Sequence, residues 1–358
     1  MRTSAAAAVT AALVLTGALS ASPAQAAPPA GVEITCGATI ASDAYLARNL
    51  TCTEGVTVTA GAVLDLNGKT LAGADGGTVA ITVDSPADVH VVDGRISGWG
   101  VGASNFGTGG RTNVSGVAFT GNGTAYTFIG AGGDIVDSRF EDNAVAMSGL
   151  FGIVSVDSSV FRNNTEGMSL SGGGYMGIRD SRFSGNGSAV GASEGSFDIY
   201  TSTFEGNDTA IRGWWTGGTI EGNRFAGNGT ALHATTFTGS GYDIVGNVFT
   251  KNTIGIYTED NVTLTGNEFT QNGTALKSGP YHEDDFHIFI PIARLDGNYF
   301  ARNGDAVLLE IPSELKETTA IRNSGYGIYA PRATDLGGNV AYGNGIEPQC
   351  TGVVCAGR

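Results

Sequence analysis

Short apolar segments alternate with polar turns along most of the chain. The stretch DIVGNVFTKNTIGIYT, from Asp243 to Thr258, contains three such segments, each only two to four residues long and separated by turn residues. Segments of this length suit short strands, whereas a helix needs a longer periodic run. The pattern therefore predicts an all-β protein.

The segments recur with a period of about 21 residues. A Phe marks the same position in nine units, and an Asn follows three places after each Phe; Ala replaces Phe in two further units, at Ala320 and Ala341. A Ser or Asn lies two places before most of these positions, and an apolar residue comes four places after most of the Asn residues. The repeated aromatic residues are Phe119, Phe140, Phe161, Phe183, Phe204, Phe225, Phe249, Phe269 and Phe300.

A repeat with three short strands predicts a stack of coils. Each strand pairs in parallel with its equivalent in the next coil, the Phe residues stack inside, and the Asn residues form ladders at the corners. Asn suits the corners because it tolerates positive φ and can bond its own backbone. A leucine-rich repeat has a similar period, but its Leu spacing is missing here.

This repeat resembles the right-handed parallel β-helix of the pectate-lyase-like superfamily, of the secreted bacterial type. Weaker coils at Val63–Leu71 and Val91–Trp99 are similar, and the resemblance covers roughly residues 33 to 355. The handedness follows from the resemblance and from the right-handed rule for parallel crossovers. We therefore expect one domain, a right-handed parallel β-helix with coils of about 21 residues, capped at both ends.

The N-terminus has the pattern of a secretory signal. Arg2 precedes an apolar run from Ala5 to Leu19, which is too short to span a membrane, and Ala24-Gln25-Ala26 forms a small-x-small cleavage site. We expect residues 1–26 to be removed and the mature protein to be secreted and extracellular. The expected organisation continues with an N-terminal cap at 27–60, the β-helix at 61–345 and a C-terminal cap at 346–358.

The four cysteines lie at the two ends of the chain. Four cysteines allow three connectivities, but an oxidising compartment and short separations favour the local pairs Cys36–Cys52 and Cys350–Cys355. Their spacing lacks the compact C-x-x-C pair of a zinc site. Because an open β-helix exposes unpaired strand edges, we expect the disulfides to stabilise caps at both ends.

Composition excludes several classes of function. The chain has 57 Gly and a net charge of -15, so it is too acidic for a nucleic-acid-binding protein. No second long apolar segment follows the signal, so we expect no membrane span. We expect a monomer.

Candidate chemistry lies where outward-facing residues depart from the repeat. If Leu232 and Ile256 point inward, the next residue of each coil points to solvent. On four successive coils that position holds Arg212, His233, Tyr257 and Lys277, about 4.8 Å apart from coil to coil. The resemblance places this row on the first of three sheets, whose face carries the cleft in many carbohydrate-active β-helices.

Further polar and aromatic residues flank the row. Two places further along the strands lie Trp214 and Glu259, with Trp215 and Asp260 beside them, and all four are expected on the same surface. The segment YHEDDFHIFIP, Tyr281 to Pro291, follows Lys277 and lengthens the interval between Phe269 and Phe300 to 31 residues. We expect it to form a loop over the row and to contact substrate through residues that include Tyr281, His282 and His287.

These residue types suit chemistry on uronic-acid polysaccharides. Removal of the proton beside a carboxylate needs a cation to neutralise that carboxylate, which Arg212 or Lys277 supplies. It also needs a base and a proton donor, for which His233 and Tyr257 are the candidates. Trp214 and Trp215 offer flat apolar faces to sugar rings. We predict a lyase acting by β-elimination, or an epimerase.

Other functions remain open at this point. Hydrolysis needs two carboxylates about 5 to 9.5 Å apart, and a secreted β-helix can also bind glycan, or serve a structural role, without catalysis. The same carboxylates would suit Ca²⁺, and His282 with His287 would suit a transition metal, but none has a diagnostic ligand spacing. The chain lacks an Asp-rich column like the calcium site of pectate lyases, which argues against pectate as the substrate. The candidate carboxylates for hydrolysis are Glu259, Asp260, Glu283, Asp284 and Asp285.

Overall fold

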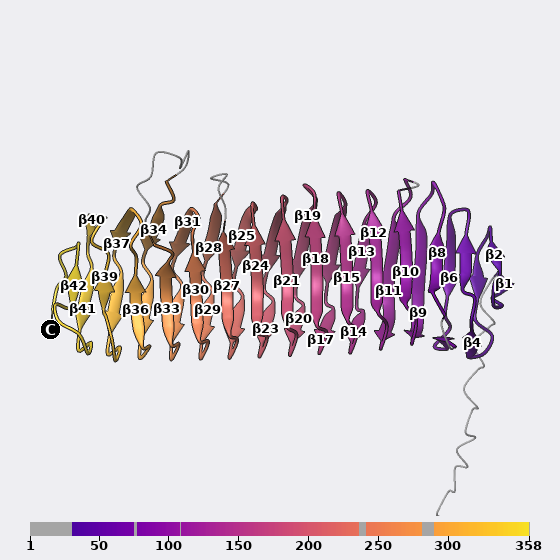
Figure 1. Cartoon of the computed structure of the whole chain (residues 1–358), viewed down its shortest axis with the longest axis horizontal. Coiled ribbons are helices and arrows are strands. Elements are labelled where there is room, and N and C mark those ends of the chain that lie inside the picture. The colour runs from indigo at the N-terminus through magenta and orange to yellow at the C-terminus, as the bar shows by residue number, and fades with distance from the viewer. Residues whose placement is uncertain (1–30, 75–76, 108, 236–240, 281–289, 358) are drawn as a thin grey trace, which may run out of the picture.

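The protein is a rod of stacked coils, each built from short parallel strands (Figure 1). The computed structural model describes residues 31–74, 77–107, 109–235, 241–280 and 290–357. The signal expected at 1–26 lies outside these residues. Within the described ranges, no helix is long and apolar enough to cross a membrane.

One face of the rod is a parallel sheet that receives one strand from each coil. In the described part of the chain it has 15 strands, which pair in sequence order from the N-terminal to the C-terminal end. Its strands are β2 (Thr39–Ile40), β5 (Val56–Val58), β8 (Val79–Val83), β10 (Val101–Phe106), β12 (Thr124–Ile129), β15 (Val145–Leu150), β18 (Glu166–Ser171), β21 (Ser188–Ser193), β24 (Thr209–Trp214), β27 (Thr230–Thr235), β30 (Ile254–Thr258), β33 (Thr274–Ser278), β36 (Asp305–Leu308), β39 (Ile328–Tyr329) and β42 (Cys350–Thr351).

The remaining strands form a second parallel sheet, with 27 strands among the described residues. It consists of two ladders that share the long strands β9 and β11. The first ladder contains β1 (Val32–Glu33), β3 (Ala44–Tyr45), β6 (Ala62–Asp65), β9 (Val89–Ser97), β11 (Thr112–Thr120), β13 (Gly133–Val136), β16 (Ile153–Asp157), β19 (Tyr175–Arg179), β22 (Ser196–Tyr200), β25 (Gly217–Glu221), β28 (Tyr242–Val245), β31 (Val262–Thr265), β34 (Ala293–Asp296), β37 (Ser313–Lys316) and β40 (Ala333–Gly337). The second adds β4 (Leu50–Cys52), β7 (Thr70–Gly73), β14 (Arg139–Glu141), β17 (Val160–Arg162), β20 (Arg182–Ser184), β23 (Thr203–Glu205), β26 (Arg224–Ala226), β29 (Val248–Thr250), β32 (Glu268–Thr270), β35 (Tyr299–Ala301), β38 (Thr319–Ile321) and β41 (Val340–Tyr342).

The repeated Phe residues form a continuous stack inside the rod. From Phe119 to Phe300 each ring lies parallel to the next, with centroids 4.5 to 5.0 Å apart, and all are fully buried. Ala320 and Ala341 continue the column by strand register. The predicted parallel β-helix with an internal Phe column is confirmed.

The Asn residues form the predicted ladder at one corner. The backbone nitrogen and the Nδ2 of Asn186 both donate to Oδ1 of Asn207, each at 2.9 Å. Asn207 in turn donates through Nδ2 to the carbonyl oxygen of Phe183 at 3.1 Å. The same bonds recur from coil to coil, so each buried amide supports the backbone of its neighbour.

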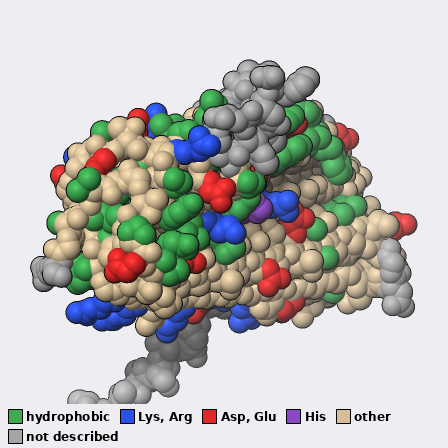
Figure 2. Space-filling model, turned by 60° about the vertical axis from the view of Figure 1, so that its left-hand side comes forward, with side chains coloured by type: hydrophobic (Ala, Val, Ile, Leu, Met, Phe, Trp, Pro, Cys, Tyr) green, Lys and Arg blue, Asp and Glu red, His purple; other side chains and the backbone are tan. Residues whose placement is uncertain are grey.

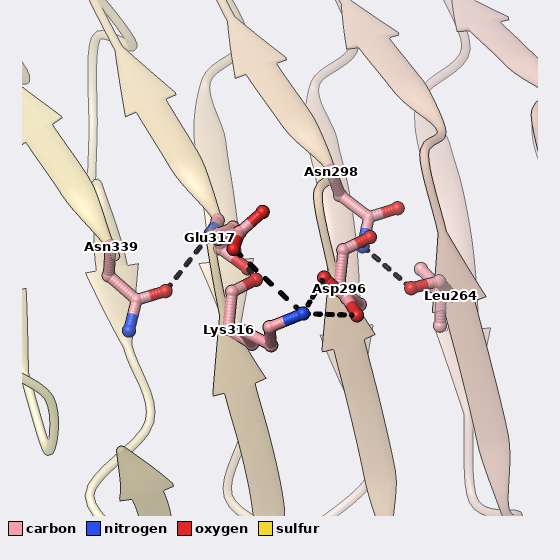
Figure 3. A network of polar contacts seen from close by, with 7 residues as sticks. Leu264, Asp296, Asn298, Lys316, Glu317 and Asn339 are labelled. Atoms are coloured by element: carbon pink, nitrogen blue, oxygen red, sulfur yellow. Dashed lines mark hydrogen bonds and ion pairs between the residues drawn. The ribbon is translucent and has the colours of Figure 1, made fainter. Parts of the chain in front are cut away.

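A second ladder runs along the small polar positions two places before the Phe residues. In it Asn298 donates through Nδ2 to the carbonyl oxygen of Leu264 at 2.7 Å (Figure 3). On the same coils, Lys316 on β37 pairs with Asp296 on β34 at 3.1 Å. That pair is half exposed and contributes little stability. The buried ladders, and not the surface ion pairs, hold the coils in register.

The two predicted disulfides are present. Cys36 is bonded to Cys52, 16 residues away, and Cys350 to Cys355, five residues away. Parallel pairing already begins at β1 and continues to β42, inside the stretches expected as caps. The division of the chain into caps and β-helix stays a prediction.

Candidate functional site

The four residues predicted to line one groove lie side by side on the 15-stranded sheet. Arg212 on β24 pairs in register with His233 on β27, His233 with Tyr257 on β30, and Tyr257 with Lys277 on β33. The residues on either side of each are buried, so these side chains point outward. We call these four residues the outward row. Figure 2 shows Lys or Arg, His and acidic side chains next to one another on one face of the rod.

Tyr257 is the centre of the row. The His233 ring meets the Tyr257 ring edge-on, with centroids 5.0 Å apart and an angle of 83° between the planes. On the other side, Nζ of Lys277 lies 5.4 Å from the centroid of the Tyr257 ring. The Tyr257 hydroxyl donates to Oε1 of Glu259. Imidazole, phenol, ammonium and carboxylate therefore form one connected group.

The surroundings set the protonation of this group. Partial burial lowers the pKa of His233 below its usual 6.5, and the Arg212 charge lowers it further, while Glu259 acts in the opposite direction. Burial and the bond to Glu259 raise the pKa of Tyr257 to about 12. At neutral pH the row therefore holds a neutral imidazole, which can accept a proton, beside a neutral phenol, which can donate one.

Two adjacent indoles stand at the edge of the row. The Trp214 and Trp215 rings are stacked with centroids 4.8 Å apart and are 44% and 38% exposed. Trp215 has a φ of 54°, a conformation that bulky residues rarely adopt. Phe151 and Glu194 have φ values of 58° and 57° at the equivalent turn of other coils, so this conformation belongs to the repeat. Both Trp residues thus lie on the surface, where the sequence placed them.

Asp260 does not lie on this surface, and its prediction as an exposed neighbour of Glu259 was wrong. Strand alternation continues past Glu259 and turns Asp260 inward, where it is fully buried. Its Oδ1 accepts the backbone N–H of Asn261 at 2.6 Å, but Oδ2 has no hydrogen-bond partner within the described ranges. Burial raises the pKa of Asp260 to about 7.

The predicted loop over the row lies mostly outside the described residues. Tyr281, His282 and His287 fall in the range 281–289, as do Glu283, Asp284 and Asp285. Phe269 still pairs with Phe300 across the long interval, so the extra residues leave the coil register unchanged. The expected contacts of the loop stay predictions.

The structure adds a hollow that the sequence did not predict. It has a volume of about 300 Å³ and adjoins the row at Arg212, on β18, β21 and β24. Its signal in the sequence is the run of small residues, Ser169 and Gly191, that precedes Arg212 in the outward column. The lining residues are Glu166, Ser169, Leu170, Ser171, Ser188, Gly191, Ala192, Ser193, Arg212 and Trp214.

A metal site does not emerge from the part of the chain that the structure describes. It contains no group of three or more His, Cys, Asp or Glu residues placed to hold a metal ion. All four cysteines are in disulfides. His282 and His287 lie outside the described residues.

Comparison with known proteins identifies the family of the chain and solved structures with a similar fold. The family model described as "Periplasmic copper-binding protein (NosD)" matches residues 88–286, more than half of the chain. No curated protein matches the sequence.

Solved structures with the same architecture include the periplasmic alginate epimerase AlgG. It has a TM-score of 0.52 and 12% identity, and the match covers 80% of this chain and 78% of that one. A catalytic domain of a GH87 α-1,3-glucanase in complex with tetrasaccharides has a TM-score of 0.49 and 10% identity, covering 89% and 71%. At 12% identity the likeness to AlgG concerns the fold alone.

Proposed function

The chain belongs to the NosD family, described as periplasmic copper-binding protein, and on this β-helix we propose that the outward row is a catalytic site for uronic-acid polysaccharides. The observation that carries the proposal is the contact between His233 and Tyr257, with a cation on either side along consecutive strands. A base and an acid held between two positive charges match the needs of proton removal beside a carboxylate.

The first step is removal of the proton at the carbon that bears the carboxylate. The neutral imidazole of His233 takes this proton, and the electron pair spreads into the carboxylate. Arg212 and Lys277 stabilise the added negative charge, which is larger in the transition state than in the substrate. Such positioned cations act most strongly where water is partly excluded, as it is around the half-buried His233 and Lys277.

Two outcomes follow from the same intermediate. In β-elimination the bond to the neighbouring glycosidic oxygen breaks, and that oxygen takes the Tyr257 proton, which leaves a double bond in the sugar ring. In epimerisation Tyr257 gives its proton to the same carbon from the opposite face. Both are the lyase or epimerase chemistry expected from the sequence. The weak acidity of Tyr257, with its pKa raised to about 12, keeps its proton available at neutral pH.

The wider context supports a glycan substrate outside the cytoplasm. The alginate epimerase shares the fold, which makes alginate the first uronate polymer to test. The two disulfides fit an extracytoplasmic location, and NosD and AlgG are both described as periplasmic. We propose that the protein is secreted and works on an external polysaccharide.

Hydrolysis is supported less well by the described residues. It needs an acid and a second carboxylate at a suitable separation. Asp260 is buried, and Glu259 accepts the hydrogen bond of Tyr257. The other candidates, Glu283, Asp284 and Asp285, lie outside the described residues.

Copper, which the family description names, does not fit the described residues. Imidazole suits copper, and thiolate or thioether ligands select Cu(I). The cysteines are in disulfides, the thioethers of Met147, Met168 and Met176 are buried in the core, and His90 on β9 is many coils away from His233 on β27. The proposed chemistry therefore runs through side chains alone, and no step is assigned to a metal.

A panel of uronate polymers tests the proposal. The protein is mixed with each polymer, and ultraviolet absorbance of unsaturated products, new reducing ends and binding are followed in parallel. Unsaturated product, or a changed ratio of epimers, is the expected result. Binding without any product would make the row a non-catalytic glycan site, and reducing ends without unsaturation would indicate hydrolysis; either result contradicts the proposal.

A further inference from the structure

We propose that the hollow on β18, β21 and β24 binds a second pyranose unit of the same glycan chain, beside the unit that reacts. Gly191 is the residue that determines whether this unit fits. The inference rests on the proposed function, and it adds a binding subsite and a specificity-determining residue.

The position of the hollow follows from strand register. Ser169, Gly191 and Arg212 occupy the same outward position on three consecutive strands, and His233 is the next residue of that column. Arg212 therefore separates the hollow from the reacting group. A sugar chain lying along the column has one unit at His233 and Tyr257 and its neighbour in the hollow.

The lining suits a ring with many hydroxyl groups. Ser169, Ser171 and Ser193 lie in two outward columns of the floor, and Ser188 lies at the start of β21. Each serine hydroxyl can donate and accept, as sugar hydroxyls do. Trp214 forms part of the wall, where an indole can cover the apolar side of a pyranose.

The charges of the lining orient the bound unit. Arg212 and Glu166 both line the hollow, and they lie on strands two coils apart. An acidic sugar is attracted by the first and repelled by the second. The carboxylate of a uronate in the hollow is therefore directed toward Arg212, and its hydroxyl groups toward the serine floor.

Gly191 leaves the hollow open, although the backbone conformation at this position does not require glycine. A Cβ at this position would meet only the Met168 carbonyl oxygen, at the ordinary contact distance of 3.7 Å. Its φ lies outside the left-handed region that requires glycine elsewhere in this chain. A glycine inside a strand weakens it and often marks a place where a ligand approaches closely. The absent side chain at Gly191 is thus better explained by a ligand than by the fold.

The test fills the hollow and leaves the catalytic group untouched. Gly191→Leu places a side chain on the floor, and Ser148→Leu is the matched control, because Ser148 is in the same outward column but outside the lining. Dissociation constants are measured by calorimetry for alginate oligomers of six units and for a single uronate. Thermal melting verifies that each variant is folded, and Gly191→Ser serves as a smaller replacement if Gly191→Leu does not fold.

The expected result is a loss of about tenfold or more in hexamer affinity for Gly191→Leu, a change that corresponds to about 1.4 kcal/mol. Ser148→Leu should bind the hexamer as the wild type does, and binding of the single uronate should be the same in all proteins. Equal hexamer affinity in Gly191→Leu and wild type would overturn the subsite alone. Failure of the wild type to bind any uronate oligomer would overturn the proposed function itself.

Discussion

His233 shows at the residue scale how its surroundings determine whether it can act as a base. Burial and the Arg212 charge both favour the neutral imidazole, so the pKa of His233 lies below 6.5. Activity that depends on neutral His233 should rise with pH through this pKa and reach its plateau at a lower pH than it would with an ordinary histidine. The Glu259 charge favours the protonated imidazole and so partly offsets the lowering of the His233 pKa.

Replacement of Arg212 should move this pH dependence. Arg212→Ala removes a charge that disfavours the protonated ring, so the pKa of His233 should rise and the acidic limb of kcat/KM should move to higher pH. Arg212→Lys, which retains the charge, is the control and should keep the limb in place. The profile of each variant is measured between about pH 4.5 and 8.5; a shift of the Arg212→Ala limb to lower pH would contradict the assignment of His233 as the base.

Asp260 gives a second prediction at the residue scale. Its pKa of about 7 in the folded protein exceeds its usual 3.8, so the folded state holds the proton more tightly than the unfolded state. Stability should therefore fall as pH rises from about 4 to about 7, by a few kcal/mol in total. Asp260→Asn does not titrate and should be more stable than the wild type at pH 8 but similar near pH 4.

Urea unfolding at the two pH values measures this difference. Asp208→Asn, at an exposed turn, is the matched control and should show no comparable gain. An equal effect of Asp260→Asn at both pH values would mean that the buried carboxyl does not titrate in this range.

The sequence predicted the outward row but not everything near it. Arg212, His233, Tyr257 and Lys277 could be placed because strand alternation and the coil repeat fix both their face and their neighbours. The Trp214–Trp215 stack and the burial of Asp260 depend on the turn that follows each strand, which the repeat does not specify. The hollow was missed because it arises where Gly191 has no side chain, and a missing side chain gives no recognisable sequence motif.

At the scale of the element, the coil is held by buried amides. Asn207 accepts two hydrogen bonds from Asn186 and satisfies the carbonyl oxygen of Phe183. Asn207→Ala leaves these groups buried without partners and should lower the free energy of unfolding by about 2 to 5 kcal/mol. Chemical denaturation measures the loss.

Asn163→Gly is the control for the ladder. Asn163 is also an Asn at a corner, but it is exposed and has a φ of 55°, which Gly tolerates. It should change stability by less than about 1 kcal/mol. Similar losses in both variants would show that any corner Asn matters and that the buried ladder has no special role.

The elements themselves were readily predicted. Eleven Phe-x-x-Asn or Ala-x-x-Asn matches fix the period, and the structure places all of their Phe and Ala positions in one buried column. The exact bounds of strands such as β9 and β11 were not predicted, because Asp93 at positive φ and Gly116 bend the chain without ending the pairing. Local backbone geometry at these bends is weakly encoded in the pattern of apolar residues.

At the scale of the whole molecule, the disulfides that stabilise the ends of the rod lie far from the outward row. Each coil contacts chiefly its neighbours, so the ends and the outward row are linked only through the stack. The Cys36–Cys52 bond closes a loop near one end, and its removal as Cys36→Ser with Cys52→Ser should cost about 3 kcal/mol. Activity at 25 °C should be unchanged, since the row is several coils away; a folded double variant with much lower activity would show coupling along the rod.

The central claim is that His233 and Tyr257 move a proton at the carbon beside a uronate carboxylate. Proton NMR of alginate treated with the protein in D₂O tests it most directly, because an epimerised unit takes up deuterium at that carbon and an eliminated unit gains a vinyl proton signal. We predict one of these changes with the wild type and a loss of about 100-fold or more with His233→Ala and with Tyr257→Phe, although both variants stay folded. An alginate spectrum unchanged by the wild type, or changed equally by all three proteins, would contradict the claim.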